Sequence, residues 1–226
     1  MEAQPYQPSE GSLDRLRQVR FVAVVGPTAV GKTTLIQAAM AREPAVHLVI
    51  GSTSRQKRPG ERNGVDYHFE TRAVMEARIA RGEYAQVAPS AFGDIYATAA
   101  ADYETDGVAV FPTLADAMPV FEALPFKDCR AVFILPPGWE PWQPRIASHQ
   151  FTPEDRAKRM REAVRSLQFA RQHPEMTFII SRQVEVATDD FVAAVFARPY
   201  SAALQADQQL APDIIADLLR HLTAEQ

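Results

Sequence analysis

The residues with the clearest chemical meaning follow an apolar run near the start of the chain. Residues 21–25 lead directly into Gly26-Pro27-Thr28-Ala29-Val30-Gly31-Lys32-Thr33-Thr34. This spacing fits G-x-x-x-x-G-K-[ST] at the end of a buried strand, the context in which the pattern has physical meaning. The glycines let the backbone curl so that consecutive N–H groups converge on a phosphate. Lys32 would then reach the terminal phosphates of a nucleotide, and the Thr33 hydroxyl would ligate Mg²⁺.

The residues after this loop are helix formers. Residues 34–40, Thr-Leu-Ile-Gln-Ala-Ala-Met, predict a helix whose positive N-terminal end points at the same anion. The bland alternative is a glycine-rich turn without a function, since such turns often join a strand to a helix. Because strand, loop and helix occur in the required order, the sequence favours phosphate binding by residues 26–34.

The composition limits the classes of protein that fit. The chain has 226 residues, 46% of them hydrophobic and 23% charged, with a formal charge of −4. This length suits one α/β domain with an appendage. The negative charge argues against bulk nucleic-acid binding, so an anion site must be a local cluster of arginines. Cys129 is the only cysteine, which excludes internal disulfides. We expect it to be buried and unreactive.

The sequence contains no stretch typical of a signal peptide and no apolar window long enough for a membrane span. We therefore expect a cytoplasmic protein with no membrane contact and no nucleic-acid partner.

Five strand-like runs alternate with helix-like stretches along the chain. They occupy residues 21–25, 46–50, 108–111, 131–135 and 177–181. This alternation predicts an α/β fold, a three-layer sandwich of the P-loop NTPase type with a mostly parallel central sheet. Ligands of such sheets bind beyond the carboxyl ends of the strands, where the first strand delivers the phosphate loop.

Two insertions interrupt the alternation. Residues 51–98 contain a basic, glycine-containing stretch and a predicted helix over residues 71–81. Residues 137–156 form the second insertion and run into a polar loop, which we interpret as a mobile lid. A helix should follow over residues 152–170, with Thr152 as its N-cap and a proline in its first turn.

The two ends of the chain lie outside this pattern. Residues 1–19 predict a loose segment, and residues 191–226 predict a helical extension with a helix over residues 212–222. One apolar stripe marks that helix, formed by Ile215, Leu218, Leu219 and Leu222. We expect the stripe to dock on the core, with a homodimer contact as the alternative.

A second chemical signal lies in the basic stretch, which reads Ser52-Thr53-Ser54-Arg55-Gln56-Lys57-Arg58-Pro59-Gly60-Glu61-Arg62-Asn63-Gly64-Val65-Asp66-Tyr67-His68-Phe69. Four cations within eight residues usually form a solvated loop. Here Pro-Gly and Asn-Gly turns fix the loop. Arg55 and Arg58 can fork onto one dianionic phosphate, to which the Tyr67 hydroxyl adds a neutral donor.

With these residues the chain resembles the guanylate kinase family, which transfers a phosphoryl group from Mg·ATP to GMP. The family's acceptor signature is T-T-R-x-x-R-x-G-E-x-x-G-x-x-Y-x-F, and residues 53–69 depart from it only at Ser54. Two further matches are Phe133-Ile134-Leu135-Pro136-Pro137 before the lid and Lys158-Arg159-Met160 after it. The resemblance covers residues 20–190, with residues 51–98 as the acceptor-binding insertion and residues 137–156 as the lid.

The resemblance also implies a role for individual residues. Arg55, Arg58 and Tyr67 would hold the phosphate of the acceptor. Tyr96 matches the second tyrosine of the family's G-N-Y-Y-G-[TS] and would hold the same group, and Thr98 ends this motif. Lys32 would steady the phosphates of the co-substrate ATP, with Mg²⁺ on Thr33. The arginines that close over the transferring phosphoryl group correspond to Arg145 and Arg159.

The departures from the family pattern fall on positions that choose the base. Gly51 occupies the place of a serine, and Gln86 that of a glutamate that accepts hydrogen bonds from guanine. Thr113 and Ala115 stand at the aspartate positions of a D-x-D motif. A second lid arginine falls near His149, and the asparagine that touches the donor's adenine is replaced by Ser181.

Three hypotheses follow. The chain is a phosphotransferase from Mg·ATP to GMP or dGMP, with partial base pairing by Gln86, Thr113 and Ser90. Alternatively, it is a kinase of the same fold for a different phosphorylated acceptor. Thirdly, it is a non-catalytic nucleotide-binding module. In each case its partners are small nucleotides or related phosphorylated molecules.

Overall fold

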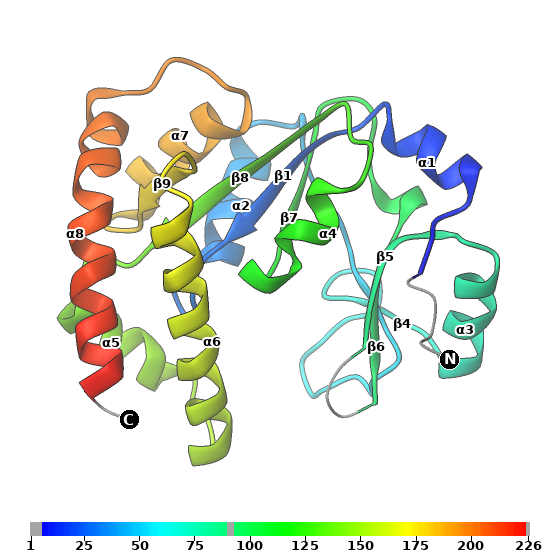
Figure 1. Cartoon of the computed structure of the whole chain (residues 1–226), viewed down its shortest axis with the longest axis horizontal. Coiled ribbons are helices and arrows are strands. Elements are labelled where there is room, and N and C mark those ends of the chain that lie inside the picture. Colours follow the sequence, from blue (N-terminus) through cyan, green and yellow to red (C-terminus); the bar gives the residue numbers. More distant parts are fainter. Residues whose placement is uncertain (1–5, 90–92, 225–226) are drawn as a thin grey trace. The chain divides into compact units, whose positions relative to one another are not determined.

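The computed structural model describes residues 6–89 and 93–224 (Figure 1). The chain forms two compact units. The first comprises the residues as far as Phe21 together with His47–Phe111 and Pro119–Cys129. The second comprises Val22–Val46, Pro112–Met118 and the residues from Arg130 onward.

The central sheet has five strands in the order β2-β7-β1-β8-β9. They are β1 (Arg20–Val25), β2 (Val46–Leu48), β7 (Val108–Pro112), β8 (Asp128–Leu135) and β9 (Thr177–Ile180). Every predicted strand-like run forms one of these strands, so the α/β prediction is confirmed. Strands β8 and β9 pair in parallel, with Phe133 opposite Phe178. Residues 132–135 of β8 and 178–180 of β9 are apolar and buried, as expected of parallel strands that are covered on both faces.

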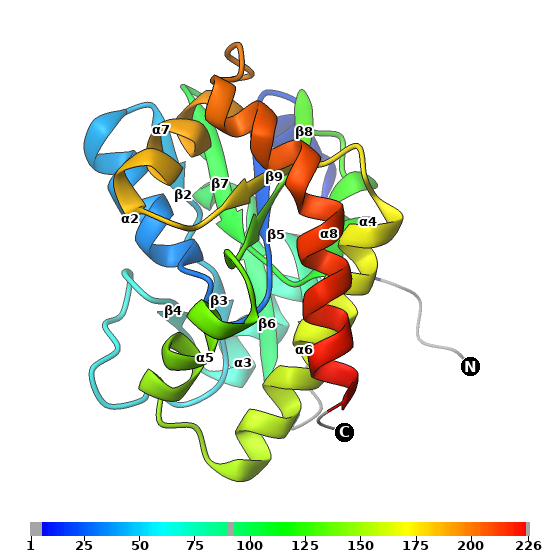
Figure 2. The ribbon, with the colours of Figure 1, turned by 90° about the vertical axis from the view of Figure 1, so that its left-hand side faces the viewer.

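Helices cover both sides of strands β8 and β9 in the second unit. Figure 2 shows α2 (Lys32–Arg42) and α7 (Val184–Val195) on one side, and α6 (Pro153–Gln172) and α8 (Ala202–Ala224) on the other. The predicted helix after the lid is confirmed as α6, and the Thr152 hydroxyl accepts a hydrogen bond from the N–H of Asp155 at 3.1 Å. None of the helices in the described part of the chain is long and apolar enough to cross a membrane.

The segment predicted as a polar lid loop is instead largely helical. Helix α5 spans Trp139–Ser148 and contains Pro144. Proline is unfavourable in a helix interior, because it removes a helix hydrogen bond. Trp139, Trp142 and Ile146 are buried at helical spacing on one face. Burial of these large side chains therefore outweighs the proline penalty, and the prediction of an irregular loop over these residues is wrong.

The C-terminal helix starts earlier than predicted. Helix α8 begins at Ala202 and runs through Pro212, the residue at which the sequence predicts the helix start. The Ser201 hydroxyl caps it by accepting a hydrogen bond from the N–H of Leu204 at 3.0 Å. The predicted apolar stripe is buried within its own unit, where α8 packs against α6 and β9. The docking prediction is thus confirmed, and the stripe is covered by its own chain.

A smaller sheet organises the first unit, with the order β4-β3-β6-β5. Its strands are β3 (Ser52–Thr53), β4 (His68–Phe69), β5 (Tyr84–Pro89) and β6 (Ile95–Ala99). Strands β5 and β6 pair antiparallel, as do β3 and β6, whereas β3 and β4 are parallel. The predicted helix over residues 71–81 forms α3 (Arg72–Ala80). Strands β3 and β4 hold the two ends of the basic stretch, and residues 54–67 form the loop between them.

The N-terminal segment is more ordered than predicted. Helix α1 spans Glu10–Leu16, and the Ser9 side chain caps it. The Ser12 hydroxyl donates to the carbonyl of Gly82 at 2.7 Å, and Arg15 Nε donates to that of Ala100 at 2.9 Å. These contacts are far apart in sequence, which is why local patterning suggested a loose segment.

Cys129 lies at the half-buried start of β8 rather than in the core. Burial nonetheless raises the pKa of its thiol to about 11, with the nearby Glu122 and Asp128 carboxylates acting in the same direction. A thiol with this pKa is almost fully protonated at neutral pH and is a poor nucleophile. The prediction of an unreactive cysteine fits this environment, although its burial is only partial.

Candidate functional site

The backbone of the glycine-rich loop has a shape that few side chains tolerate. Gly26 has φ 145°, Ala29 has φ 59° and Gly31 has φ 95°. A Cβ atom at Gly26 would lie 2.4 Å from the carbonyl oxygen of Ile134, which is too close for any other residue. Gly31 is the N-cap of α2, so the loop delivers the chain directly to the positive end of that helix. The predicted strand, loop and helix are therefore present in order.

Lys32 turns its ammonium group back into this loop. Its Nζ donates to the carbonyl oxygens of Gly26 and Pro27 at 2.6 and 2.9 Å. Part of the side chain is exposed, but burial of the ammonium group lowers its pKa to about 8, and the charge of Arg159 acts in the same direction. The negative charge of Glu162 partly opposes this shift. A desolvated cation held only by carbonyl dipoles is well placed to bind an anion.

A cavity of about 630 Å³ lies beside the loop in the second unit. Its size is within the range that small-molecule sites occupy. The loop and the start of α2 line it together with Arg145, Ser148, His149, Ser181, Arg182, Gln183, Val184 and Ala187.

Of the two predicted arginines, only Arg145 belongs to the described residues that line this cavity. Arg145 donates from Nη1 to the Ser181 hydroxyl at 3.0 Å and from Nη2 to the Ser181 carbonyl at 2.8 Å. Arg159 donates to Glu162 at 2.9 Å on α6, and its charge reaches Lys32. His149, at the second lid arginine position, lines the cavity and stacks on Phe151 with ring centroids 5.3 Å apart.

The residues present fit a magnesium ion that is shared with a nucleotide. Thr33 is exposed in the first turn of α2 and lines the cavity. Within residues 6–89 and 93–224, no group of three or more His, Cys, Asp or Glu side chains could hold a metal by itself. Because Mg²⁺ commonly keeps water and phosphate oxygens as ligands, one protein hydroxyl is sufficient. The donor set therefore favours Mg²⁺ delivered with a polyphosphate.

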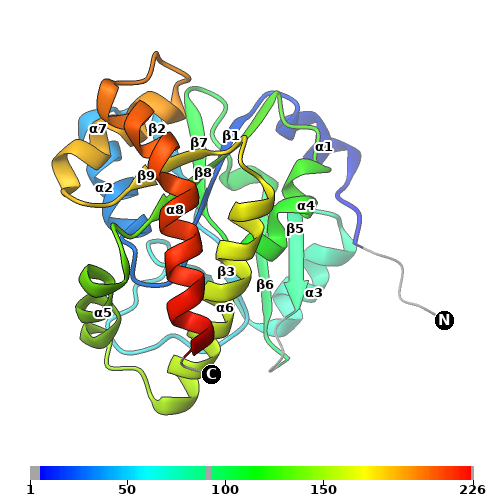
Figure 3. The same ribbon diagram turned by 60° about the vertical axis from the view of Figure 1, so that its left-hand side comes forward.

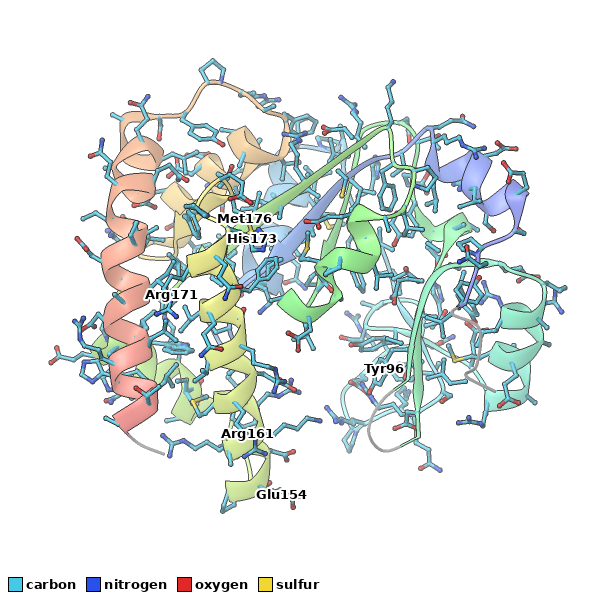
Figure 4. All side chains as sticks on the ribbon, in the orientation of Figure 1. Tyr96, Glu154, Arg161, Arg171, His173 and Met176 are labelled. Carbon is cyan, nitrogen blue, oxygen red and sulfur yellow. The ribbon has the colours of Figure 1, made fainter. Side chains whose placement is uncertain are left out.

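A second cluster forms in the first unit around Arg55. Its guanidinium donates from Nη1 and Nη2 to the two carboxylate oxygens of Glu61 at 2.7 and 2.6 Å. The same group lies over the Tyr67 ring, 5.3 Å from its centroid, and Glu61 and, to a smaller extent, Tyr96 raise its pKa. Tyr67 and Tyr96 meet edge to face with centroids 6.1 Å apart, and Figure 4 labels Tyr96 on β6. The structure therefore brings together three of the four residues predicted to hold the acceptor phosphate.

The fourth residue, Arg58, joins this cluster through its backbone. Its N–H donates to Glu61 Oε2 at 2.7 Å, whereas its side chain is exposed. Glu61 itself was not among the predicted site residues. The sequence signals for it are its place in the Pro-Gly-Glu turn, six residues after Arg55, and the fixed glutamate of the family's acceptor signature. The hydrogen bonds from Arg55 hold the pKa of the Glu61 carboxyl down to about 2 and raise the pKa of Arg55.

This ion pair predicts a defined acid dependence of folding. The carboxyl pKa is about 2 in the folded protein against 4.5 ordinarily, so the pair stabilises the fold fully above pH 4.5. That contribution decreases as the pH falls from 4.5 to about 2. Urea unfolding of Glu61→Gln should show a smaller loss of stability over this interval than the parent chain. The exposed Glu104→Gln is the control, and equal pH dependence in all three proteins would contradict the assignment.

The predicted base-reading positions are distributed over both units. Gln86 on β5 lies opposite Thr98 on β6 and is 9% exposed. Thr98 is fully buried, and its hydroxyl is bonded to that of Tyr103 at 2.8 Å. Thr113 belongs to the second unit, where its N–H donates to the Val24 carbonyl at 3.1 Å. Ser90 lies outside the described residues.

Gly51 has room for a side chain. A Cβ atom there would lie 3.4 Å from the carbonyl oxygen of Ala97 and 3.6 Å from the Tyr67 ring, which are ordinary or slightly tight contacts. Steric exclusion therefore does not explain the missing serine at this position.

Comparison with known proteins shows which family this chain resembles. The guanylate kinase family model matches residues 18–196 and so includes the expected domain, residues 20–190. A guanylate kinase from Nostoc sp. is 32% identical over 182 residues, covering 78% of this chain and 85% of that protein. One from Aromatoleum aromaticum is 31% identical over 196 residues, covering 84% and 94%. The crystal structure of guanylate kinase from Anaplasma phagocytophilum has the same fold, with a TM-score of 0.54 at 17% identity over 82% of this chain and 88% of that one.

Proposed function

Because the chain belongs to the guanylate kinase family, we propose that it transfers the γ-phosphoryl group of Mg·ATP to a nucleoside monophosphate, with GMP or dGMP as the acceptor. The observation that supports this proposal is that residues suited to binding phosphate gather at two places, one in each unit. The second unit has the glycine-rich loop with Lys32, and the first unit has Arg55 with the two tyrosines.

The donor residues supply positive charge and position. Phosphoryl transfer asks little acid–base chemistry of the protein, because the transition state mainly needs in-line alignment and neutralised oxygens. Lys32 would exchange its two loop carbonyls for phosphate oxygens, while Arg145 and Arg159 add charge around the transferring group. Mg²⁺, held through the Thr33 hydroxyl, would neutralise charge on the donor phosphates.

The proposed acceptor residues would bind a phosphate dianion even though Arg55 is already paired with Glu61. A guanidinium has five N–H donors, so Glu61 can orient Arg55 and still leave donors for phosphate. Tyr67, Tyr96 and the exposed Arg58 side chain would complete the set of donors. Glu61 thus acts as a positioning residue, which fixes the plane of the Arg55 fork.

A coupled assay of ADP release tests the proposal. Purified protein with Mg·ATP is offered GMP, dGMP, AMP, CMP, UMP and IMP in turn. We expect turnover with the guanine nucleotides. A maximum on another acceptor would support a kinase of altered specificity, and nucleotide binding without any turnover would support a non-catalytic module.

The altered base-reading positions predict a gain of function. Gln86→Glu, alone or with Gly51→Ser, should lower the KM for GMP by about tenfold, since a charged hydrogen-bond acceptor is worth ~1.5–3 kcal/mol. The KM for AMP should not fall, because adenine offers no N1–H. Gln18→Glu adds the same charge at an exposed position of the first unit and serves as the control. If Gln86→Glu raises the KM for GMP, the native amide itself reads the base.

A further inference from the structure

Helix α8 begins at Ala202, beyond residue 196, where the match to the family model ends. It nevertheless packs closely on the second unit, beside α6 and β9, as Figure 3 shows. We propose that α8 is a positioning element of the donor-nucleotide site and that Asp207 on this helix holds Arg182 in the cavity wall. This inference rests on the proposed function only in taking the cavity as the place where ATP binds.

The contact begins at the open edge of the central sheet. Strand β9 is the last strand in the sheet order and pairs with β8 on its inner side. On its outer side the Gln208 amide accepts from the N–H of Phe178 at 2.9 Å and donates to the carbonyl of the same residue at 2.6 Å. Asp207 Oδ2 accepts from the N–H of Ile180 at 2.8 Å. Side chains of α8 therefore take the place that a further strand would occupy.

Asp207 also reaches beyond the strand. Its Oδ1 accepts from Nη1 of Arg182, two residues after the end of β9. The carboxylate is 3% exposed, and both of its oxygens are used in these bonds. A buried carboxylate with two defined partners has little freedom to move, because leaving either oxygen unpaired is costly.

The residue held in this way belongs to the cavity wall. Arg182 lines the cavity, and so does its neighbour Ser181. Ser181 in turn receives both hydrogen bonds from Arg145. Asp207 therefore holds the segment Ser181-Arg182, which lines the cavity. Ser181 of this segment orients Arg145.

A second contact links α8 to α5, the helix that carries the cavity-lining residue Arg145. The His221 ring stacks on Trp139 of α5, with centroids 5.4 Å apart and planes 7° from parallel. Trp142, which also lies on α5, donates from its indole N–H to the Thr28 carbonyl in the phosphate loop at 3.0 Å. Helix α8 thus contacts both the end of β9, which leads into Arg182, and α5, which carries Arg145.

The neighbouring residues Asp207 and Gln208 offer a matched comparison. Both tie α8 to the outer edge of β9, but only Asp207 contacts a cavity-lining residue. Asp207→Asn keeps the size of the side chain and an acceptor for the Ile180 N–H while removing the charge that holds Arg182. Gln208→Ala removes the bonds to Phe178 and leaves Arg182 in place.

The experiment measures the KM for ATP, the KM for the acceptor, the Tm, and the Kd of a non-hydrolysable ATP analogue by calorimetry. We expect Asp207→Asn to raise the donor KM and Kd about five- to tenfold with an unchanged acceptor KM. Gln208→Ala should lower the Tm without changing the donor constants. Unchanged donor constants in Asp207→Asn, or equal changes in both variants, would overturn the inference.

Arg182→Gln tests the same ion pair by changing its more exposed partner. It therefore gives a result even if the Asp207 variant does not fold. It should raise the donor Kd, and adding Asp207→Asn to it should change the Kd little further. If the effects of the two substitutions on the donor Kd were fully additive, Asp207 would not act through Arg182. Analogue binding by the parent chain without turnover on any monophosphate would overturn the proposed function alone, because the Asp207 comparison is read from donor binding.

Discussion

Lys32→Ala is expected to lower kcat by about a thousandfold, while the variant remains folded. The Lys32 ammonium is the cation that the glycine-rich loop encloses, 2.6 Å from one of its own carbonyl oxygens and 2.9 Å from another. No other lysine belongs to the cavity lining among the described residues. Its loss removes charge where the γ-phosphoryl oxygens develop theirs, and water cannot replace a fixed cation in a partly enclosed site.

The same surroundings explain why folding should survive this substitution. An ammonium group buried against carbonyl dipoles, with Arg159 close enough to lower its pKa, is a costly arrangement for the free protein. Its removal should leave the Tm unchanged or slightly raised. Lys127→Ala, at an exposed position of the first unit, controls for a general loss of positive charge. A Lys32→Ala variant with near-normal kcat would show that the loop does not bind the donor.

The phosphate loop and the strands were predictable because their signals are local. Gly26 and Gly31 have the positive φ angles that a curled loop requires, and the apolar runs coincide with the buried strands. Helix α5 was missed because its signal, two tryptophans and an isoleucine at helical spacing, is interrupted by prolines. Proline is a strong local signal, and only the packing of Trp139 and Trp142 shows that it was outweighed here.

The parts of the site that could not be predicted depend on contacts between distant segments. The hydrogen bond from the Ile180 N–H to Asp207 and the stacking of His221 on Trp139 have no local pattern. Thr98 has the right position in its motif, yet the tertiary fold pairs its hydroxyl with Tyr103. The Arg55–Glu61 pair is an intermediate case, because both residues lie in one loop and only the turn between them brings them together.

Arg55→Ala is the second prediction with a large effect, and it should act on the acceptor alone. We expect the acceptor KM to rise by about ten- to a hundredfold, since one charge-assisted hydrogen bond to phosphate is worth ~1.5–3 kcal/mol. A lower kcat should accompany it, because a loosely held acceptor is poorly aligned for transfer. The donor KM should stay constant, as the Arg55 cluster belongs to the first unit and the donor cavity to the second. Initial rates with each substrate varied in turn separate these effects.

Arg62→Ala is the matched control in the same loop, because the Arg62 side chain is exposed and the hydrogen bonds that Arg62 makes to Val65 and Asp66 come from its backbone. Arg55→Lys should give an intermediate acceptor KM, since lysine keeps the charge but cannot fork between a carboxylate and a phosphate. An unchanged acceptor KM in Arg55→Ala would remove this residue from the site.

Part of the Arg55→Ala effect should come from the partner that it leaves behind. In the parent chain the Glu61 carboxylate is neutralised by Arg55 and also accepts from the Arg58 backbone N–H. Without Arg55, its negative charge faces the incoming dianion and repels it. Adding Glu61→Gln to Arg55→Ala should therefore restore part of the acceptor affinity, whereas Glu61→Gln alone should weaken it because the Arg55 fork loses its orientation. This reversal of sign between the two backgrounds distinguishes a positioning carboxylate from one that only stabilises the loop, which would weaken binding in both.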